Sequence, residues 1–331
     1  MQSVTQEYIL APEEKSILNT LLYFDVFDHP LNHEELYQTC IVNGETKKDF
    51  GFYLDHLQKL GLIVEGSGMF FLEGKQNNVT ERIQERKRVK KYYRMARIMT
   101  RIIASFPFVR GVFVSGSLSK MRAARDSDID YFVVTKPGRL WISRTMLMIF
   151  KKLFLFNSYK YFCLNYFVDY HSLHIESRDL YIATEIITLV PLYNNELYHN
   201  FMEANQWVKR FYPQAPRRSS KYVVKPLLGV FKRVMEKVFD NARGNKLDDY
   251  LMKKTLAYRK RKFSWLSNEQ FEQAFITRRN ASKHHPEDFR DRVLKTFREK
   301  QTDFEQRHKI HLHPNKKDKT HFYDVKKTTT R

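Results

Sequence analysis

Cysteine is scarce in this chain of 331 residues, and glycine and proline are few. The two cysteines, Cys40 and Cys163, cannot build a disulfide framework, and the sequence holds neither a C-x-x-C pair nor a Cys/His spacing typical of metal sites. With only 11 glycines and 10 prolines, we expect most of the chain to be ordered and largely helical outside a few central strands.

Long apolar runs are also lacking. The most apolar segment, residues 146–150, is followed by Lys151 and Lys152 and is too short to cross a bilayer. Residues 1–20 do not combine a basic start with an apolar core, so we expect no signal peptide. These two absences predict a cytoplasmic protein without a transmembrane segment.

Acidic residues are too few to balance the basic ones, and the formal net charge of +21 is unevenly spread. Residues 1–75 hold 5 Lys and Arg against 12 Asp and Glu, a net charge of −7, whereas residues 211–331 hold 31 against 14, a net charge of +17. Such polarity along one chain indicates separate modules with different partners, and the basic region favours contact with a polyanion.

The stretch GVFVSGSLSKMRAARDSDIDYFVV, residues 111–134, is the most informative part of the chain. An apolar run at 112–114 ends at the Ser-Gly-Ser of 115–117, and an Asp-Ile-Asp at 128–130 leads into a second apolar run at 131–134. The β-branched and aromatic residues of both runs predict two strands, joined through a tight turn and a polar excursion.

The acids of this stretch are expected to lie side by side. Side chains i and i+2 of a strand share a face, so Asp128 and Asp130 point the same way. Two adjacent carboxylates repel each other unless a cation lies between them, and paired oxygen ligands suit Mg²⁺. Gly116 lets the backbone approach a ligand closely, and Ser117 offers a hydroxyl and an N–H to phosphate oxygens. Together with the basic residues of the excursion, these are the parts of a phosphoryl-transfer site.

The Gly-Ser turn, the ten-residue gap and the Asp-x-Asp pair resemble the signature of the DNA polymerase β-type nucleotidyltransferase superfamily. The resemblance covers residues 109–135 closely and 80–190 loosely. It implies that Gly116 and Ser117 hold a nucleoside triphosphate (NTP), and that Asp128 and Asp130 bind catalytic Mg²⁺ or Mn²⁺.

The resemblance also implies a third carboxylate on a following strand, which commonly acts as general base. Asp169 is placed best for this role and Glu176 and Glu185 are rivals, but Asp169 fits a plain turn residue equally well. Lys120 or Arg125 is expected to steady the γ-phosphate. Two other interpretations of the motif stay open: a surface β-turn beside an acidic strand edge, and a calcium loop, which the missing glycine and distal glutamate disfavour.

Residues 12–75 carry the pattern of a winged helix-turn-helix. Helices are predicted from Pro12, after a cap at Asn32, and from Thr46 to Gly61, followed by a β-hairpin over 62–72. DNA reading by the third helix is one interpretation, but the negative charge of this region opposes phosphate binding. A docking or regulatory module is therefore preferred.

Periodicity and caps predict the rest of the central region. We expect a long basic helix over 78–106 capped by Thr80, a helix over 140–156, strands over 159–168 and 173–175, and a helix that begins at Asp179. The face of the long basic helix is either solvated or directed at a polyanion beside the site.

The basic C-terminal region is expected to be helical. Residues 221–239 are amphipathic and basic, and helices are predicted around 247–262 and 287–308. The charge runs at 259–262 and 278–279 could follow a nucleic-acid backbone or an anionic membrane surface, or simply be the solvated face of a helical bundle. Residues 314–331, poor in apolar groups, are expected to form a disordered tail.

We therefore predict an α/β (α+β) protein with a winged-helix-like module at 1–77, a small mixed-sheet nucleotidyltransferase core at 78–210, a basic helical region at 211–313 and a tail at 314–331. The expected reaction transfers a nucleoside monophosphate from an NTP to an unidentified acceptor, a small molecule, RNA or protein. Two alternatives remain: a catalytically degenerate nucleotide-binding regulatory protein that signals through the winged helix, and a basic nucleic-acid-binding protein.

Overall fold

The computed structural model describes residues 10–40, 47–158, 160–218, 223–284 and 289–312. Within these ranges the chain is a mixed α/β protein with a three-stranded antiparallel sheet and a six-stranded mixed sheet. The fold class is thus confirmed. The residues of the expected disordered tail, 314–331, lie outside the described ranges. None of the described helices is long and apolar enough to cross a membrane.

The N-terminal module has the elements of a winged helix in the predicted order. The helices are α1 (Pro12–Asp25), α2 (His33–Thr39) and α3 (Lys47–Lys59), and the strands β1 (Leu31–Asn32), β2 (Val64–Gly66) and β3 (Met69–Phe71) form a sheet of order β1-β3-β2. Asn32 caps α2 as expected: its side chain accepts from the N–H of Glu35, whose carboxylate accepts from the N–H of Asn32.

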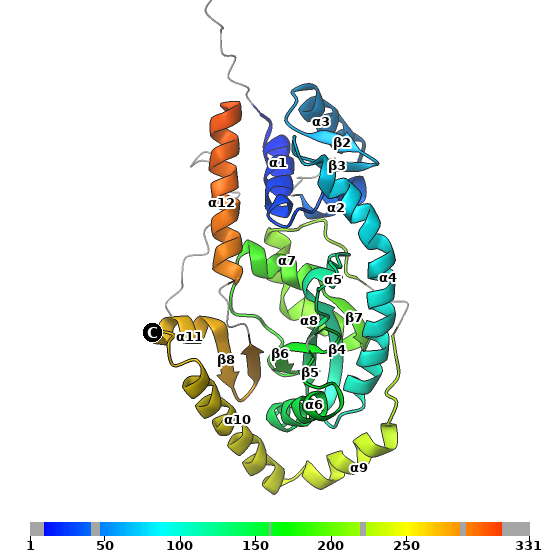
Figure 1. Ribbon diagram of the computed structural model, residues 1–331, viewed down its shortest axis with the longest axis vertical. Helices are drawn as coiled ribbons and strands as arrows, with labels where there is room; N and C mark the ends of the chain where they lie inside the picture. The colour runs from blue at the N-terminus through cyan, green and yellow to red at the C-terminus, as the bar shows by residue number, and fades with distance from the viewer. Residues whose placement is uncertain (1–9, 41–46, 159, 219–222, 285–288, 313–331) are drawn as a thin grey trace, which may run out of the picture.

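Helix α4 (Gln76–Ala104) leads from this module to the large sheet and runs along its side (Figure 1). It begins four residues before Thr80, so the predicted cap is wrong. Its buried residues Val89, Tyr92, Ala96 and Ile103 recur at helical spacing and belong to the core beneath the sheet. The long helix is therefore held by this apolar stripe, while most of its basic residues face solvent.

The large sheet has the order β7-β4-β5-β6-β9-β8, in which only β5 and β6 pair in parallel. Its strands are β4 (Val109–Ser115), β5 (Asp130–Thr135), β6 (Cys163–Asp169), β7 (Val190–Tyr193), β8 (Phe275–Arg278) and β9 (Ala281–His284), and α6 (Leu140–Phe154) joins the parallel pair. The strands β4 and β5 confirm the two strands predicted within residues 111–134, but β5 begins at Asp130, so Asp128 precedes the strand instead of lying on it.

Residues of β4 and β5 alternate between the two faces of the sheet. Tyr131 and Val133 pack with α4 and α6, whereas Phe132 and Val134 pack into the core with α7 (Leu180–Thr188) and α8 (Asn195–Ala204). Asp130 thus begins β5 on the α7 face, like Phe132 two residues on. A short 3₁₀ helix, η1 (Gln206–Arg210), follows α8.

One predicted strand is absent from the structure, and one strand of the structure is not predicted from the sequence. Residues 173–175 form no strand, and Val190–Tyr193, which contains Pro191, pairs with β4 as β7 at the edge of the sheet. An edge strand tolerates proline because one side of it needs no ladder hydrogen bonds. The helix of residues 180–188 is confirmed, and Asp179 caps it by accepting from the N–H of Ile182 at 3.0 Å.

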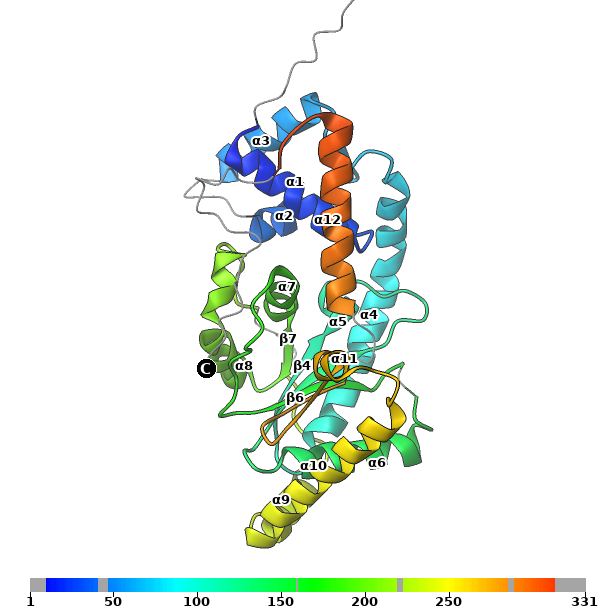
Figure 2. The same ribbon diagram turned by 90° about the vertical axis from the view of Figure 1, so that its left-hand side faces the viewer.

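The C-terminal region holds the helices α9 (Gly229–Phe239), α10 (Ala242–Lys262), α11 (Asn268–Ala274) and α12 (Phe289–His308), but it is not only helical. The hairpin β8–β9 extends the large sheet at β6, and α12 lies beside α1 (Figures 1 and 2). Gln301 donates to the buried Asn19 of α1 at 2.6 Å, and Lys300 pairs with Asp25 at 2.6 Å. One apolar core therefore joins the N-terminal module, one face of the large sheet and α12.

Candidate functional site

The turn after β4 is shaped by Gly116. The chain leaves β4 at Ser115 and enters the short helix α5 (Gly116–Ser119), with Gly116 at φ +66°. A Cβ atom on Gly116 would overlap Oδ2 of Asp130 and lie 3.1 Å from its Cγ. Both the backbone angle and this close approach require glycine. Ser115 is paired with Asp130 in the β4–β5 register, so the turn and the acid meet at the same end of the two strands.

The predicted acid pair lies on the wall of one cavity. Asp128 and Asp130 both line it, together with Gly116 and Ser117. The pKa of Asp130 is raised to about 6, mainly by burial; the charges of Glu185 and Asp128 add to this rise, and the charge of Lys120 opposes it. Burial also raises the pKa of Asp128. The carboxylates are thus close enough to affect each other, and a cation would lower the cost of keeping both ionised.

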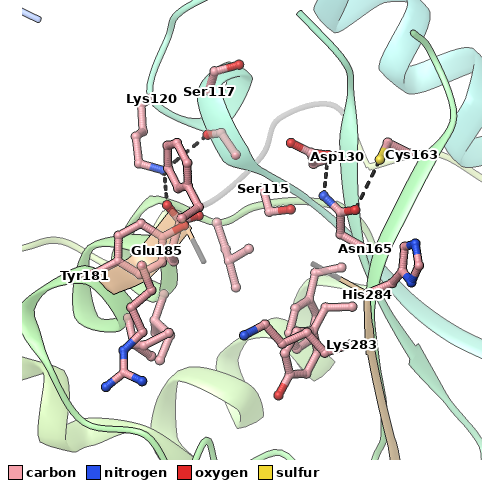
Figure 3. Close-up of a pocket in the computed structure, with 18 of the residues that line it drawn as sticks. Ser115, Ser117, Lys120, Asp130, Cys163, Asn165, Tyr181, Glu185, Lys283 and His284 are labelled. Carbon is pink, nitrogen blue, oxygen red and sulfur yellow. Dashed lines mark hydrogen bonds and ion pairs between the residues drawn. The ribbon is translucent and has the colours of Figure 1, made fainter. Parts of the chain in front are cut away.

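The neighbouring strand β6 places an amide, not a carboxylate, beside Asp130. The parallel register pairs Tyr131 with Leu164 and Phe132 with Tyr166, so Asn165 is the extra residue of a β-bulge. Its Nδ2 donates to Oδ1 of Asp130, and Sγ of Cys163 donates to its Oδ1 at 3.1 Å. Figure 3 shows this chain of side chains at the cavity. Asn165 therefore fixes the orientation of Asp130.

An ion pair connects the excursion after the turn with the facing helix α7. Lys120 donates to Glu185 of α7 at 2.6 Å and to the carbonyl oxygen of Gly116 at 3.2 Å. Lys120, Glu185 and Tyr181 all line the cavity, opposite Asp130 and Asn165 in the close-up (Figure 3). Lys120 is thus positioned beside the turn.

The other predicted residues lie elsewhere. Asp169 ends β6 opposite Thr135, the far end of the strand pair from Asp130, and its Oδ1 accepts from the N–H of His171 at 3.0 Å. It is 5% exposed and does not line the cavity, so it acts as a turn residue rather than as the third carboxylate. Arg125 is exposed and away from the cavity wall.

Two other charged residues considered from the sequence also make their interactions outside the site. Glu176 is exposed and paired with Arg278 at 3.1 Å. Arg259 belongs to the charge run for which a nucleic acid, a membrane surface and solvent were the three interpretations. It is buried and donates to the carbonyl of Ile276 and to the hydroxyl of Thr277, which holds the β8–β9 hairpin. Arg259 is therefore not available to a nucleic-acid backbone or a membrane.

The cavity, about 1000 Å³, extends well beyond the acids. Besides the strand ends that carry the acids, its lining includes the end of α1 with the following loop, the excursion after α5, helix α7, residues of α11 and of the β8–β9 hairpin, and the start of α12. His29 reaches it from the N-terminal module. This side chain is buried, its Nδ1 has no hydrogen-bond partner among the described residues, and burial with nearby cations lowers its pKa well below the usual value.

The residues present fit Mg²⁺ as a partner of bound phosphates. No group of three His, Cys, Asp or Glu side chains able to hold a metal is found in the described part of the chain. A dedicated protein cage for a metal is thus not formed there. Mg²⁺ commonly uses only one or two carboxylates together with substrate phosphates and water. Asp128 and Asp130 would supply these two carboxylates.

Sequence reasoning did not single out Asn165, Cys163 or His29 for the site. Asn165 had a signal, because it is the polar residue inside the otherwise apolar strand of residues 162–168. The sequence holds no comparable signal for His29, because its place at the cavity depends on how the N-terminal module packs against the sheet. Glu185 was recognised only as a rival of Asp169.

Comparison with protein-family models, curated proteins and solved structures finds no match to this chain. The interpretation of the site therefore depends on its own residues and their geometry.

Proposed function

We propose that the chain is a nucleotidyltransferase, which moves a nucleoside monophosphate from an NTP to an acceptor and releases pyrophosphate. The observation that supports this best is the meeting of the Gly116 turn, Asp128, Asp130 and Lys120 around one cavity. A phosphate cradle, paired carboxylates and a lysine are the groups that phosphoryl transfer needs in one place.

The triphosphate would lie along the turn, with Ser117 and Lys120 as donors to its oxygens. Mg²⁺, or Mn²⁺, held by Asp128 and Asp130 together with the phosphates would neutralise charge on them. Asn165 keeps Asp130 in the orientation in which its carboxylate faces the cavity. In the reaction the acceptor oxygen or nitrogen forms a bond to the α-phosphorus, and the bond from this phosphorus to the β-phosphate oxygen breaks.

Glu185 is our candidate for the general base in place of Asp169. It is a carboxylate on the wall that faces Asp130, and its charge acts on Asp130. Its ion pair with Lys120 at 2.6 Å fixes its position beside the turn that would hold the phosphates. The large remaining cavity would take the acceptor, and the reaction would occur in the cytoplasm, where NTP is available.

The proposal is tested by Mg²⁺-dependent pyrophosphate release with each of four α-labelled NTPs and pools of metabolites, RNA and protein. Asp130→Asn removes a metal ligand. Asp126→Asn is the matched control, because Asp126 is an exposed acid of the same excursion that does not line the cavity. Release that is lost in Asp130→Asn and retained in Asp126→Asn supports transfer, and the labelled product identifies the acceptor. Release that persists in Asp130→Asn contradicts it.

A second candidate, a nucleotide-binding regulatory protein, is favoured by one observation. Phe24, Phe27 and His29 of the winged-helix-like module line the same cavity as the acids, so a bound nucleotide would contact the module directly. The amide of Asn165 in place of a third acid fits a site that binds without turnover. NTP binding without pyrophosphate release in every pool would favour this candidate.

A further inference from the structure

Helix α9 is amphipathic, but its orientation is inverted relative to a normal surface helix. Its polar side faces the body of the protein. Lys232 is buried and donates to the carbonyl oxygens of Ala104 at 2.9 Å and Val109 at 2.6 Å. Glu236 accepts from the N–H of Phe108 at 2.6 Å and pairs with Arg110 at 2.7 Å. These contacts fix α9 to the end of α4 and the start of β4.

The apolar side of α9 faces solvent. Val230 is 66% exposed, Val234 53% and Val238 56%, and these three residues follow one another at intervals of four. Phe231 is also exposed and falls on the same side at helical spacing, and the exposed Leu227 lies just before the helix. A surface helix normally buries such a stripe, and this one, residues 230, 231, 234 and 238, is instead exposed.

Basic side chains border the stripe. Arg233 and Lys237 are exposed and lie three positions after Val230 and Val234, which places them along one edge. Lys225 is exposed just before the helix, and α9 with α10 forms one end of the molecule (Figures 1 and 2). Residues 223–262 hold 12 Lys and Arg against 4 Asp and Glu, so this end is strongly positive.

We propose that α9 docks the protein on an anionic lipid surface. An apolar stripe bordered by lysine and arginine is what lets a helix lie in the plane of a membrane interface, with its apolar side among the acyl chains and its cations at the headgroups. Because Lys232 and Glu236 hold the opposite side, the stripe is presented without any rearrangement of the fold.

The same features disfavour two other partners. A nucleic acid would use the cations but would leave the valines in water, since backbone contacts are made to phosphates. A second copy of the chain meeting through the stripe would share a self-complementary patch and bring the cationic edges of both copies together.

Co-sedimentation of the full chain with phosphatidylcholine vesicles, with and without phosphatidylglycerol, tests the proposal. Three variants are compared: Val230→Gln with Val234→Gln and Val238→Gln, then Arg233→Gln with Lys237→Gln, and as control Lys90→Gln with Lys91→Gln on the exposed side of α4. Circular dichroism and thermal unfolding verify that each variant is folded, as expected for exposed positions.

We expect binding to anionic vesicles that weakens with salt and is much lower on neutral vesicles. The valine variant should lose affinity about tenfold or more, and the Arg233/Lys237 variant should lose affinity mainly at low salt, while the control binds like the natural chain. Three results would overturn the proposal: no binding to anionic vesicles, equal binding of the valine variant, or a dimer in solution that the valine variant dissociates. Nucleic-acid binding that only the charge variant loses, without vesicle binding, would also overturn it.

Discussion

The carboxylate of Asp130 fills the space in which Gly116 would carry a side chain. A Cβ atom there would lie 3.1 Å from Cγ of Asp130 and closer still to its Oδ2. The glycine of the turn and the acid of the next strand are therefore a matched pair, and the motif is a single packed unit rather than two independent signals.

Replacement of Gly116 by alanine should displace the Asp130 carboxylate. We expect Gly116→Ala to lower NTP affinity at least about tenfold and to cost roughly 1–3 kcal/mol of the free energy of unfolding, because φ at this residue is positive and the methyl group overlaps the carboxylate. Calorimetric titration and urea unfolding measure the two effects. Gly74→Ala is the control, since Gly74 has φ +81° but nothing within 4 Å of its Cβ position. Equal effects of the two substitutions on affinity would argue against the pairing of Gly116 with Asp130.

Asp130→Asn should stabilise the protein at neutral pH while abolishing turnover. The pKa of Asp130 is raised from 3.8 to about 6 in the folded protein. Between pH 3.8 and about pH 6, the folded state therefore holds a proton on this carboxyl that the unfolded state has released. The stability that the protonated acid contributes is complete below the unfolded pKa and is lost as the pH rises through the folded pKa. At pH 7 the asparagine avoids this loss, and the free energy of unfolding should rise by about 2 kcal/mol.

The increase in the free energy of unfolding that Asp130→Asn causes should therefore shrink toward zero as the pH falls to the pKa of the unfolded state. Thermal or urea unfolding at a series of pH values, without metal or nucleotide, provides the measurement. A gain that does not change with pH would show that burial does not raise the pKa of Asp130.

Substitution of Asp169 and substitution of Glu185 should affect the kinetics differently. Asp169→Asn should change kcat/KM by no more than about twofold, because Asp169 only accepts a backbone hydrogen bond far from the cavity. Glu185→Gln should lower kcat by about 100-fold as a general base is lost, without raising KM for NTP, because the repulsion of the phosphates is lost too. Steady-state kinetics with the identified acceptor separates the two. A large loss in Asp169→Asn with little change in Glu185→Gln would reverse the assignment.

The contact between α12 and α1 should matter for stability. Gln301→Ala leaves Oδ1 of the buried Asn19 without its donor at 2.6 Å, which should cost about 1–3 kcal/mol in urea unfolding. The exposed Thr302 offers a neighbouring control, and Thr302→Ala should cost less than about 0.5 kcal/mol. If both substitutions have the same small effect, α12 is not fixed to the N-terminal module by this bond.

Local signals explain what could be predicted from sequence. The strand, turn and strand of residues 111–134 follow from β-branched runs and one glycine turn, and the caps at Asn32 and Asp179 follow from short-range spacing. The identity of a third carboxylate could not be predicted in this way, because it depends on the register between β5 and β6. A bulge places Asn165 at the acid, and it leaves Asp169 at the far end of the strand pair.

Other features depended on contacts between distant segments. The hairpin of residues 275–284 has no strong alternation of apolar and polar residues, and its place in the sheet comes from pairing with β6 and from the buried Arg259. The role of His29 likewise arises only when the N-terminal module closes one side of the cavity.

The most direct test of the nucleotide site is calorimetric titration with non-hydrolysable NTP analogues, with and without Mg²⁺, because it needs no knowledge of the acceptor. We predict binding that requires Mg²⁺, that Asp130→Asn weakens at least about tenfold, and that Asp126→Asn leaves unchanged. Binding of equal strength in Asp130→Asn and Asp126→Asn, or no binding of any NTP analogue in the presence of Mg²⁺, would contradict the assignment of this cavity as a metal-dependent nucleotide site.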